Sequence, residues 1–532
     1  MLKFVAGRVA AWCLAVALTG CATSPPISRS TVPEALPAGQ GVFAIQVVAP
    51  RPADSSSPKW RSLVLREKAS GKVYTLSDRA PGTMSHSLFA AALPAGVYSV
   101  DRFGVVMGEA STPTSVGLVM SVMFAALSSD STQPRVPTFT VEAGAATNLG
   151  VMVSPAPNEG SVGTEPFVLN DPAAQAAVTA AMDESSAARF SAMPLRGWDS
   201  PPDARRGVLL FEAEQRRPAP VTAIDLSPGH VLLGSTLGRV VAREASGAWT
   251  PMWTGSFEAV SAVQRLPDGR IVAGTDHGQL LVWEPGSRRW SRRDFARGER
   301  ILAFVPTPGQ PGLLVETQTY LGAMPGQMGR TRLRFMKDPL NPAPSAPILD
   351  LEVTGPISRL RMLVDGNDVI AISNRAGFSR TAERYRIDTR SLEITAKDDL
   401  DHFAMQLYRV PDGSLARLRV NGMSQFHDAS SDDGRTWTMG PATDVFVESF
   451  ESARNGIGMG LSGLTKAALH ETADGGRTWA RSGGVVPMQN LSILRLGSLG
   501  DRVFFLSGTT LMSTRDRGQT WTAEWWQPPT AP

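Results

Sequence analysis

Cysteine is almost absent from this 532-residue chain, which contains only Cys13 and Cys21. Both lie close to the amino terminus, so no disulfide can brace the rest of the chain, and packing must hold the fold together. Hydrophobic residues make up 42% of the chain, which is enough for a large core and excludes disorder as the main state. The 50 glycines and 40 prolines favour a β-protein with many tight turns.

A strong excess of one charge is also lacking. The chain has 52 basic and 49 acidic residues, the two signs are interleaved, and only seven of the basic residues are lysines. A nucleic-acid-binding surface needs basic residues gathered on one face. We therefore expect no nucleic-acid partner. A charged fraction of 19% likewise excludes a long coiled coil.

Apolar runs long enough to span a membrane are missing as well. A spanning helix needs about 18 or more apolar residues. Beyond the amino terminus the longest run is Val116 to Leu127, which Ser121 interrupts. We expect this run to form a buried hairpin or a short helix.

The amino terminus has the layout of a signal peptide. Lys3 and Arg8 precede ten uncharged, mostly apolar residues from Val9 to Leu18, and small residues follow. The segment Leu18-Thr19-Gly20-Cys21 resembles the bacterial lipobox, in which cleavage occurs before a cysteine that receives lipid. The resemblance implies a signal peptide over residues 1–20 and lipidation of Cys21. The alternative is an ordinary signal peptide with a coincidental cysteine.

A lipidated Cys21 would hold the chain at a membrane, because each buried methylene contributes about 0.8 kcal/mol. Ala22 stands where lipoproteins of the inner membrane commonly carry Asp, so the resemblance points to the outer membrane, with the protein facing the periplasm or, alternatively, the cell surface. Residues 21–40 are rich in Pro, Ser and Thr, and we expect a flexible tether.

Residues 41–155 carry short β-type runs bounded by Gly, Pro or Ser, which predict a small β-sandwich. The expected strands are Val42–Val48, Ser62–Arg66, His86–Leu93, Val97–Phe103, Pro137–Val141 and Asn148–Val153. The phrase Leu93-Pro94-Ala95-Gly96-Val97-Tyr98 resembles the turn and strand of transthyretin-like or carboxypeptidase-regulatory sandwiches.

Residues 156–206 are expected to connect this unit to the rest of the chain. Asp171 suits an N-cap and Pro172 the first position of a helix. We expect one short Ala-rich helix ending near Met182, with Asp183–Ser186 and Pro194 breaking it.

A repeat organises residues 207–532. Three eight-residue segments follow the pattern [S/T]-x-D-x-G-x-T-W, and their tryptophans are 42 residues apart. The positions that match are Ser430, Asp432, Gly434, Thr436 and Trp437; Thr472, Asp474, Gly476, Thr478 and Trp479; and Thr514, Asp516, Gly518, Thr520 and Trp521. The pattern resembles the Asp-box of sialidase-type (BNR) repeats, which implies a β-propeller with the boxes at its periphery.

Turn chemistry accounts for the residue types of the motif. A carboxylate in a tight turn accepts backbone N–H groups, and Gly supplies a positive φ where the chain reverses. The Thr-Trp pair then starts the next strand, and the indole packs against a neighbouring sheet. We therefore predict a structural role for the three aspartates; the alternative is that they are catalytic carboxylates.

Degenerate copies extend the repeat upstream and predict a seven-bladed propeller. Residues 231–249 parallel residues 271–290, and the second of these copies predicts strands at Ala259–Leu266, Arg270–Thr275, Gln279–Glu284 and Arg289–Phe295. Two further copies fit around Leu313–Phe335 and Val369–Ile394. Rings of six or eight blades are the alternatives.

Enzymatic signatures are scarce. Sialidases need a late Tyr nucleophile with a Glu partner, and no tyrosine follows Tyr408, so we expect none in the last three repeats. A glycosidase with two carboxylates stays an alternative. The six histidines (His86, His230, His277, His402, His427 and His470) form no metal-binding motif, and we expect neither a metal nor a cofactor.

The sequence therefore predicts a lipid-anchored envelope protein that acts as a non-enzymatic binding or assembly scaffold. A protein partner in the envelope is expected, and Asp-box propellers that help to assemble photosynthetic complexes offer an analogue at the level of fold. The alternative is a carbohydrate-active protein that binds or cleaves glycans. A scaffold should show an exposed apolar or aromatic patch, whereas an enzyme should show clustered carboxylates with shifted pKa values.

Overall fold

The computed structural model describes residues 32–50, 60–80, 83, 86–104, 137–154, 166–200, 202–227, 230–243, 246–319, 328–343, 345–354, 360–374, 382–400, 403–410, 413–421, 424–452, 454–463, 465–488 and 494–525. The predicted signal peptide, Cys21 and the run from Val116 to Leu127 lie outside these ranges. The regular elements within them are strands and three helices.

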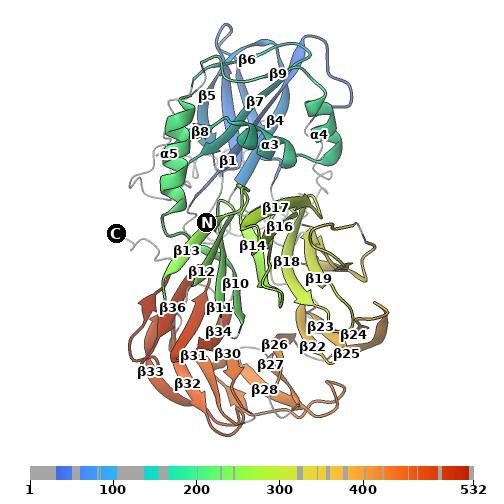
Figure 1. The fold of residues 1–532 in the computed structure, drawn as a ribbon, viewed down its shortest axis with the longest axis vertical. Coiled ribbons are helices and arrows are strands. Elements are labelled where there is room, and N and C mark those ends of the chain that lie inside the picture. Colours follow the sequence, from blue (N-terminus) through green and yellow to red (C-terminus); the bar gives the residue numbers. More distant parts are fainter. Residues whose placement is uncertain are drawn as a thin grey trace, which may run out of the picture.

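The amino-terminal unit contains two β-sheets, which occupy the upper part of Figure 1. One has the order β4-β1-β7-β8, with β9 also paired to β7, and the other has the order β3-β2-β5-β6. Strand β1 pairs antiparallel with β4 and parallel with β7. The strands are β1 (Gln40–Val48), β2 (Ser62–Glu67), β3 (Val73–Ser77), β4 (His86–Pro94), β5 (Gly96–Gly104), β6 (Phe139–Val141), β7 (Ala146–Val153), β8 (Phe167–Leu169) and β9 (Leu195–Arg196).

The two sheets share one hydrophobic core. Phe43 and Ile45 of β1 pack in the same buried cluster as Leu63 of β2 and Tyr98 of β5. The Tyr98 hydroxyl donates a hydrogen bond to the carbonyl of Pro94, 2.8 Å away, and so ties the turn before β5 to the start of that strand. All six strands expected from the sequence are present, and β3, β8 and β9 were not predicted.

Three helices follow the amino-terminal sheets: α3 (Pro172–Ala180), α4 (Glu184–Ser191) and α5 (Ala204–Gln215). Asp171 caps α3 as expected, because its carboxylate accepts the backbone N–H of Ala174 at 2.8 Å. The expected break at Asp183–Ser186 is wrong: Asp183 accepts the N–H of Ser186 at 2.9 Å and starts α4. Asp, which suits an N-cap, had been interpreted as a helix breaker.

Seven four-stranded antiparallel sheets follow α5, each built from four consecutive strands. They are β10 (Val221–Ser227), β11 (His230–Ser235), β12 (Arg239–Arg243), β13 (Trp249–Trp253); β14 (Val260–Arg265), β15 (Ile271–Thr275), β16 (Gln279–Glu284), β17 (Arg289–Asp294); β18 (Glu299–Pro306), β19 (Leu313–Thr319), β20 (Met328–Met336), β21 (Leu349–Thr354); β22 (Arg361–Asp365), β23 (Asp368–Asn374), β24 (Ala382–Asp388), β25 (Ile394–Leu400); β26 (Phe403–Arg409), β27 (Leu415–Asn421), β28 (Ser424–Ser430), β29 (Ala442–Thr443); β30 (Val445–Phe450), β31 (Gly456–Leu461), β32 (Lys466–Thr472), β33 (Ala480–Pro487); and β34 (Leu494–Leu499), β35 (Arg502–Ser507), β36 (Thr510–Thr514), β37 (Thr522–Ala523).

The first strand of each sheet contacts the first strand of the next sheet along the chain. The last sheet returns to the first, because Val221 and Leu233 share a buried cluster with Phe504 and Leu506. Sheets that follow one another around a common centre, as Figure 1 shows, form a β-propeller. The four strands expected between residues 259 and 295 match β14 to β17 within one residue at each end.

Glycines in the second strands of the first two sheets allow neighbouring sheets to approach one another closely. A Cβ on Gly234 would lie 2.6 Å from Val260 of the next sheet, and a Cβ on Gly274 would lie 2.4 Å from Ile301. The glycine common to the two degenerate repeats therefore serves packing between sheets.

The amino-terminal unit is joined to the first sheet of the propeller through a buried guanidinium. Arg239 is fully buried, and it donates hydrogen bonds to the carbonyls of Arg217 at 2.7 Å and Glu214 at 3.1 Å. It also reaches the carbonyl of Pro50 at 3.4 Å, which accepts a hydrogen bond from Thr236 as well. A buried charge needs such partners, so Arg239 joins the segment after β1, the end of α5 and the turn between β11 and β12.

Candidate functional site

The three Asp-box carboxylates lie in the turns that join the third strand to the fourth in the last three sheets. In the first box, Asp432 accepts the backbone N–H of Thr436 at 2.9 Å and its hydroxyl at 2.6 Å. Ser430 donates to Asp432 at 2.8 Å and accepts the N–H of Gly434 at 2.8 Å. The other two boxes repeat these bonds, through Thr472, Asp474, Gly476 and Thr478, and through Thr514, Asp516, Gly518 and Thr520.

These bonds stabilise the ionised carboxylates. Donation by the threonine hydroxyl, followed by donation from the threonine N–H, lowers the pKa of Asp432, Asp474 and Asp516 to about 2 in each case. The hydrogen bonds of each carboxylate stay inside its own turn, and each turn belongs to a different sheet. The structural role predicted for the aspartates is in keeping with this geometry and awaits mutagenesis.

The glycine of each box also contacts the preceding sheet. A Cβ on Gly476 would lie 3.1 Å from the ring of His427 on β28, and a Cβ on Gly518 would lie 3.0 Å from Leu469 on β32. Gly434 approaches Arg384 on β24, whose guanidinium donates to the carbonyl of Asp433. The box therefore fastens its own turn and packs against the third strand of its neighbour.

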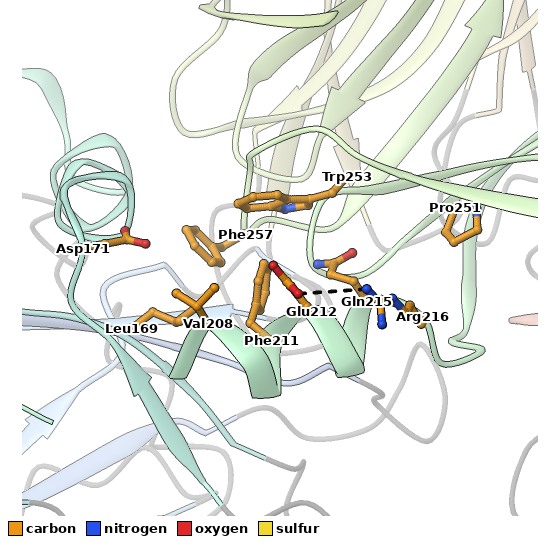
Figure 2. A pocket seen from close by; sticks show the side chains of 10 residues that line it. All are labelled: Leu169, Asp171, Val208, Phe211, Glu212, Gln215, Arg216, Pro251, Trp253 and Phe257. Atoms are coloured by element: carbon orange, nitrogen blue, oxygen red, sulfur yellow. Dashed lines mark ion pairs between the residues drawn. The ribbon is translucent and has the colours of Figure 1, made fainter. Parts of the chain in front are cut away.

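A different region, at the junction between the amino-terminal unit and the propeller, contains a pocket of about 320 Å³ (Figure 2). Helix α5 forms one wall, the end of β13 and the following loop form another, and the start of α3 closes one end. The residues that line it are Leu169, Asp171, Val208, Phe211, Glu212, Gln215, Arg216, Pro251, Trp253 and Phe257. We call it the junction pocket.

Three aromatic rings give the junction pocket its apolar surface. The centroid of Phe211 lies 5.0 Å from that of Trp253 and 5.3 Å from that of Phe257, and Trp253 and Phe257 are 5.9 Å apart. Phe211 and Phe257 are buried, whereas Trp253 is 42% exposed. The indole N–H of Trp253 donates to the carbonyl of Ser256 at 3.1 Å. The indole is therefore fixed in place with one part of its surface open to solvent.

Polar side chains surround these rings. Glu212 and Arg216 form an ion pair of 4.0 Å along α5, and both are largely exposed. The Gln215 amide donates through Nε2 to the carbonyl of Leu237 at 3.2 Å. Its Oε1 is buried and has no hydrogen-bond partner among the described residues. The pocket is therefore bordered by two carboxylates, one guanidinium and an amide whose oxygen is buried.

Helix α5 presents these groups because of their spacing. Val208, Phe211, Glu212 and Gln215 follow intervals of three, one and three residues and so share one face of the helix. Val208 and Trp253, which line the pocket, are 39% and 42% exposed, and Leu209, next to Val208 on α5, is 57% exposed. We call these three residues the apolar rim.

The junction also covers a carboxylate with a strongly shifted pKa. Glu258 is buried, and its carboxylate accepts hydrogen bonds from Thr275 and, at 3.2 Å, from Gln279. Burial, followed by the charge of Asp276, raises the pKa of Glu258 to about 8. Asp276 lies 3.6 Å from His86 of β4, and both side chains are fully buried. The amino-terminal unit therefore covers this carboxylate pair.

A tyrosine–glutamate pair does occur in the propeller. Tyr408 lies in β26, within the sheet of the first box, so the expectation of no tyrosine in the last three repeats is wrong. Its hydroxyl donates to Glu448 of the next sheet, and His427 Nδ1 lies 2.8 Å from the same carboxylate oxygen. Burial, followed by the charge of Glu448, raises the pKa of Tyr408 well above 10. The hydrogen bond from Tyr408 to Glu448 links two neighbouring sheets, and the raised pKa keeps the buried hydroxyl protonated at neutral pH.

The described ranges contain neither a metal-binding cluster nor a membrane-spanning helix. No group of three or more His, Cys, Asp or Glu side chains there could hold a metal ion. No helix in the same part of the chain is long and apolar enough to cross a membrane.

Sequence reasoning identified the boxes but missed the junction pocket. Phe211 lies in a segment that was assigned to the start of the propeller, and Trp253 and Phe257 lie between two degenerate repeats. The signal that was available is Asp203, which suits the N-cap of a helix over residues 204–215.

Comparisons with known proteins add likeness of fold only. No family model matches the chain, and no curated protein matches it. Among solved structures, puromycin hydrolase aligns with 60% of this chain at 14% identity and a TM-score of 0.43, and the alignment spans 55% of that protein. YCF48 bound to D1 peptide aligns with 56% of this chain and 94% of its own, at 16% identity and a TM-score of 0.36. Sqt1 from Saccharomyces cerevisiae aligns with 59% of this chain and 87% of its own, at 12% identity and a TM-score of 0.38.

Proposed function

We propose that the protein is a lipid-anchored cell-envelope protein that acts as a non-enzymatic binding scaffold through the junction of its two units. The observation that carries this proposal is the junction pocket with its apolar rim of Val208, Leu209 and Trp253. Exposed apolar surface that continues into a pocket is typical of binding sites. Glu258, whose pKa is raised to about 8, is buried and is not among the residues that line the pocket, which favours a binding role for this surface.

The proposal includes a finer description of the fold. The seven four-stranded sheets would be the seven blades of one closed ring, and the two amino-terminal sheets would form a β-sandwich placed on it. The shared clusters between the first and last sheets and between the two amino-terminal sheets support this description.

The binding surface lies on the face of the ring away from the boxes. Arg239 and Asp276 are at turns between second and third strands, where the amino-terminal unit contacts the propeller. The boxes join third strands to fourth strands. Consecutive turns of an antiparallel sheet lie at opposite ends, so the boxes leave the junction free for a partner.

Photo-crosslinking in cells tests the scaffold proposal. A photoreactive residue at Leu209 should capture one envelope protein, whereas the same residue at Met439, which is 69% exposed and belongs to a box-bearing sheet, should not. Equal adducts at both positions, or none at Leu209, would contradict a binding surface at the junction.

The anchor has its own test. Cys21→Ala should abolish incorporation of labelled fatty acid and release the protein from the membrane fraction or leave it unprocessed. Unchanged labelling in this variant would refute lipidation at Cys21.

A further inference from the structure

The last described residue, Trp525, lies beside the first sheet of the propeller. Its side chain is buried in one cluster with Val241 of β12 and Phe504 of β35, and Trp249 of β13 packs against that cluster. Glu524 accepts a hydrogen bond from the indole N–H of Trp249 at 2.8 Å. The chain therefore leaves the last sheet next to the start of β13.

The fourth strand of the last sheet runs toward the junction. Val221, at the start of β10, pairs with Ser235, which precedes the turn that contacts the amino-terminal unit. The backbone N–H of Val221 donates to the carbonyl of Thr509 at 2.8 Å, so the turn between β35 and β36 lies at this same end of the ring. The box after β36 therefore lies at the opposite end, and β37 returns from it toward the junction.

Strand β13 forms a line of apolar side chains in the same direction. Trp249, Pro251 and Trp253 alternate along the strand and so share one face, and the last two line the junction pocket. Figure 2 shows Pro251 at one end of the pocket, with Trp253 nearer its middle. The path from Trp249 to Trp253 is about 13 Å at the usual rise of a strand.

Residues 526–532, which we call the tail, follow Trp525 and have the sequence Trp-Gln-Pro-Pro-Thr-Ala-Pro. Seven residues can span at most about 25 Å, which is enough to pass along β13 and reach the pocket. Proline-rich segments bind grooves lined by aromatic rings, because their backbone is already restricted before binding. Pro529 and Pro532 have the P-x-x-P spacing of such segments.

We propose that the tail binds in the junction pocket of its own chain, with its prolines against the ring of Trp253. This ring is half-exposed, and Phe211, Phe257 and the bond to the carbonyl of Ser256 hold it in place, so the platform exists before the tail arrives. The tail is also tethered beside the pocket, which gives it a high effective concentration there. A volume of about 320 Å³ holds part of the tail.

The tail would act as an internal competitor at the junction, an inference that rests on the proposed scaffold function. A partner that binds in the pocket has to displace the tail first. Removal of residues 526–532 should therefore at least double the yield of the adduct captured by a photoreactive residue at Leu209 in cells. An unchanged yield would overturn the competition.

Thiol reactivity of the purified chain 22–532, which has no cysteine and keeps every described residue, tests the tail contact itself. Val208→Cys places one thiol in the pocket. We expect a maleimide to label it at least fivefold faster when residues 526–532 are deleted. The same deletion should leave the labelling of Met439→Cys unchanged. Equal rates at position 208 with and without the tail would overturn the proposal.

Two further measurements assign the contact to the prolines and to the pocket. Pro529→Ala combined with Pro532→Ala keeps the length of the tail and should raise the labelling rate at position 208 at least twofold; an unchanged rate would overturn the role of the prolines. A diazirine-bearing residue at Thr530 should crosslink to residues 204–217 or 249–257. Adducts found only elsewhere would overturn the assignment to the pocket.

The tail contact and the scaffold proposal can fail separately. If the tail protects position 208 in the purified protein but Leu209 captures no envelope protein in cells, the scaffold proposal fails and the tail contact stands. If Leu209 captures a protein but deletion of the tail leaves labelling at position 208 unchanged, the tail contact fails and the scaffold proposal stands.

Discussion

A single carboxylate organises each Asp-box turn at the residue scale. Asp474 accepts the N–H of Thr478 at 2.9 Å and its hydroxyl at 2.6 Å, and Thr472 donates to it at 2.8 Å. These bonds join the end of the third strand to the residues before the fourth. The same side chain has no hydrogen bond to a residue outside the box among those recorded for the described chain, so its effect is local.

Asp474→Ala should lower the free energy of unfolding by roughly 1–2 kcal/mol, because the turn loses its charged acceptor. Denaturant unfolding monitored by circular dichroism would measure the change. Asp501→Ala is the matched control, because Asp501 is exposed and its ion pair with Arg515 is 3.8 Å long. Equal loss of stability in the two variants would contradict a turn-specific role.

Residues of the boxes could be predicted because their chemistry is local. Asp, Gly and Thr within eight positions define a turn whatever surrounds it. Trp253 and Gln215 could not be predicted as partners in one pocket, because they are 38 positions apart and meet only when α5 packs against the first blade. The sequence around each of them carries no mark of the other.

Glycines and turns decide how the strands pack at the scale of elements. Gly476 has a φ of 82° and lies against the ring of His427 on the preceding sheet. Glycine is therefore required here for two reasons: the turn needs a positive φ, and a side chain would crowd the ring of His427 on the preceding sheet.

Gly476→Ala should destabilise the protein by more than Gly463→Ala does. Gly463 has a φ of 98°, but a Cβ there would have no neighbour within 4 Å. The two variants share the backbone strain of about 1–2 kcal/mol, so the difference in thermal midpoint isolates the contact with His427. Equal midpoints would show that the contact between sheets contributes nothing.

Strand positions were predicted well where turns are short and marked. Within the second repeat, Pro267-Asp268-Gly269 separates β14 from β15 and Pro285-Gly286 separates β16 from β17, and the four predicted strands match β14 to β17. Helix α4 was missed because Asp183, its N-cap, was interpreted as the end of the preceding helix, and α5 was missed because its apolar residues were assigned to the first blade. Tertiary packing stabilises both helices: α4 packs on the amino-terminal unit through Ala187 and Phe190, and α5 packs at the junction through Phe211.

Buried polar groups join the two units at the scale of the whole molecule. Arg239 satisfies its guanidinium with carbonyls from both units and α5, and Glu258 and Asp276 lie beneath the amino-terminal sheet that contains His86. The sequence of one chain gives no sign of such an interface, because each of these residues resembles an ordinary surface charge in its local context.

Glu258 makes the stability of the whole molecule depend on pH. Its folded-state pKa of about 8 lies above the ordinary value of 4.5, so the folded state binds the proton more tightly. Its contribution to stability is fully present below pH 4.5 and is lost as the pH rises through about 8. Glu258→Gln should therefore raise stability at pH 9 by an amount on the order of a few kcal/mol and flatten this dependence.

Thermal unfolding of the wild type and Glu258→Gln between pH 5 and pH 9 would measure this effect. The two proteins should differ little at pH 5 and most at pH 9. A constant difference across the range would show that Glu258 does not titrate in the folded protein.

The central claim is that the junction between the two units is the functional surface. The solvent accessibility of the junction in living cells tests this claim most directly. Once the signal peptide is removed and Cys21 is lipidated, the mature chain would contain no free thiol, so a single introduced cysteine reports alone. Ala213→Cys places a thiol on the exposed side of α5, four residues after Leu209, and Met439→Cys is the control on a box-bearing sheet.

A membrane-impermeant maleimide applied to cells with a permeabilised outer membrane should label Cys at 439 readily and Cys at 213 slowly, while both should react equally in the purified protein. This outcome would show that a partner covers the junction in the cell. Equal labelling at both positions in cells, or protection at 439 instead of 213, would contradict the account.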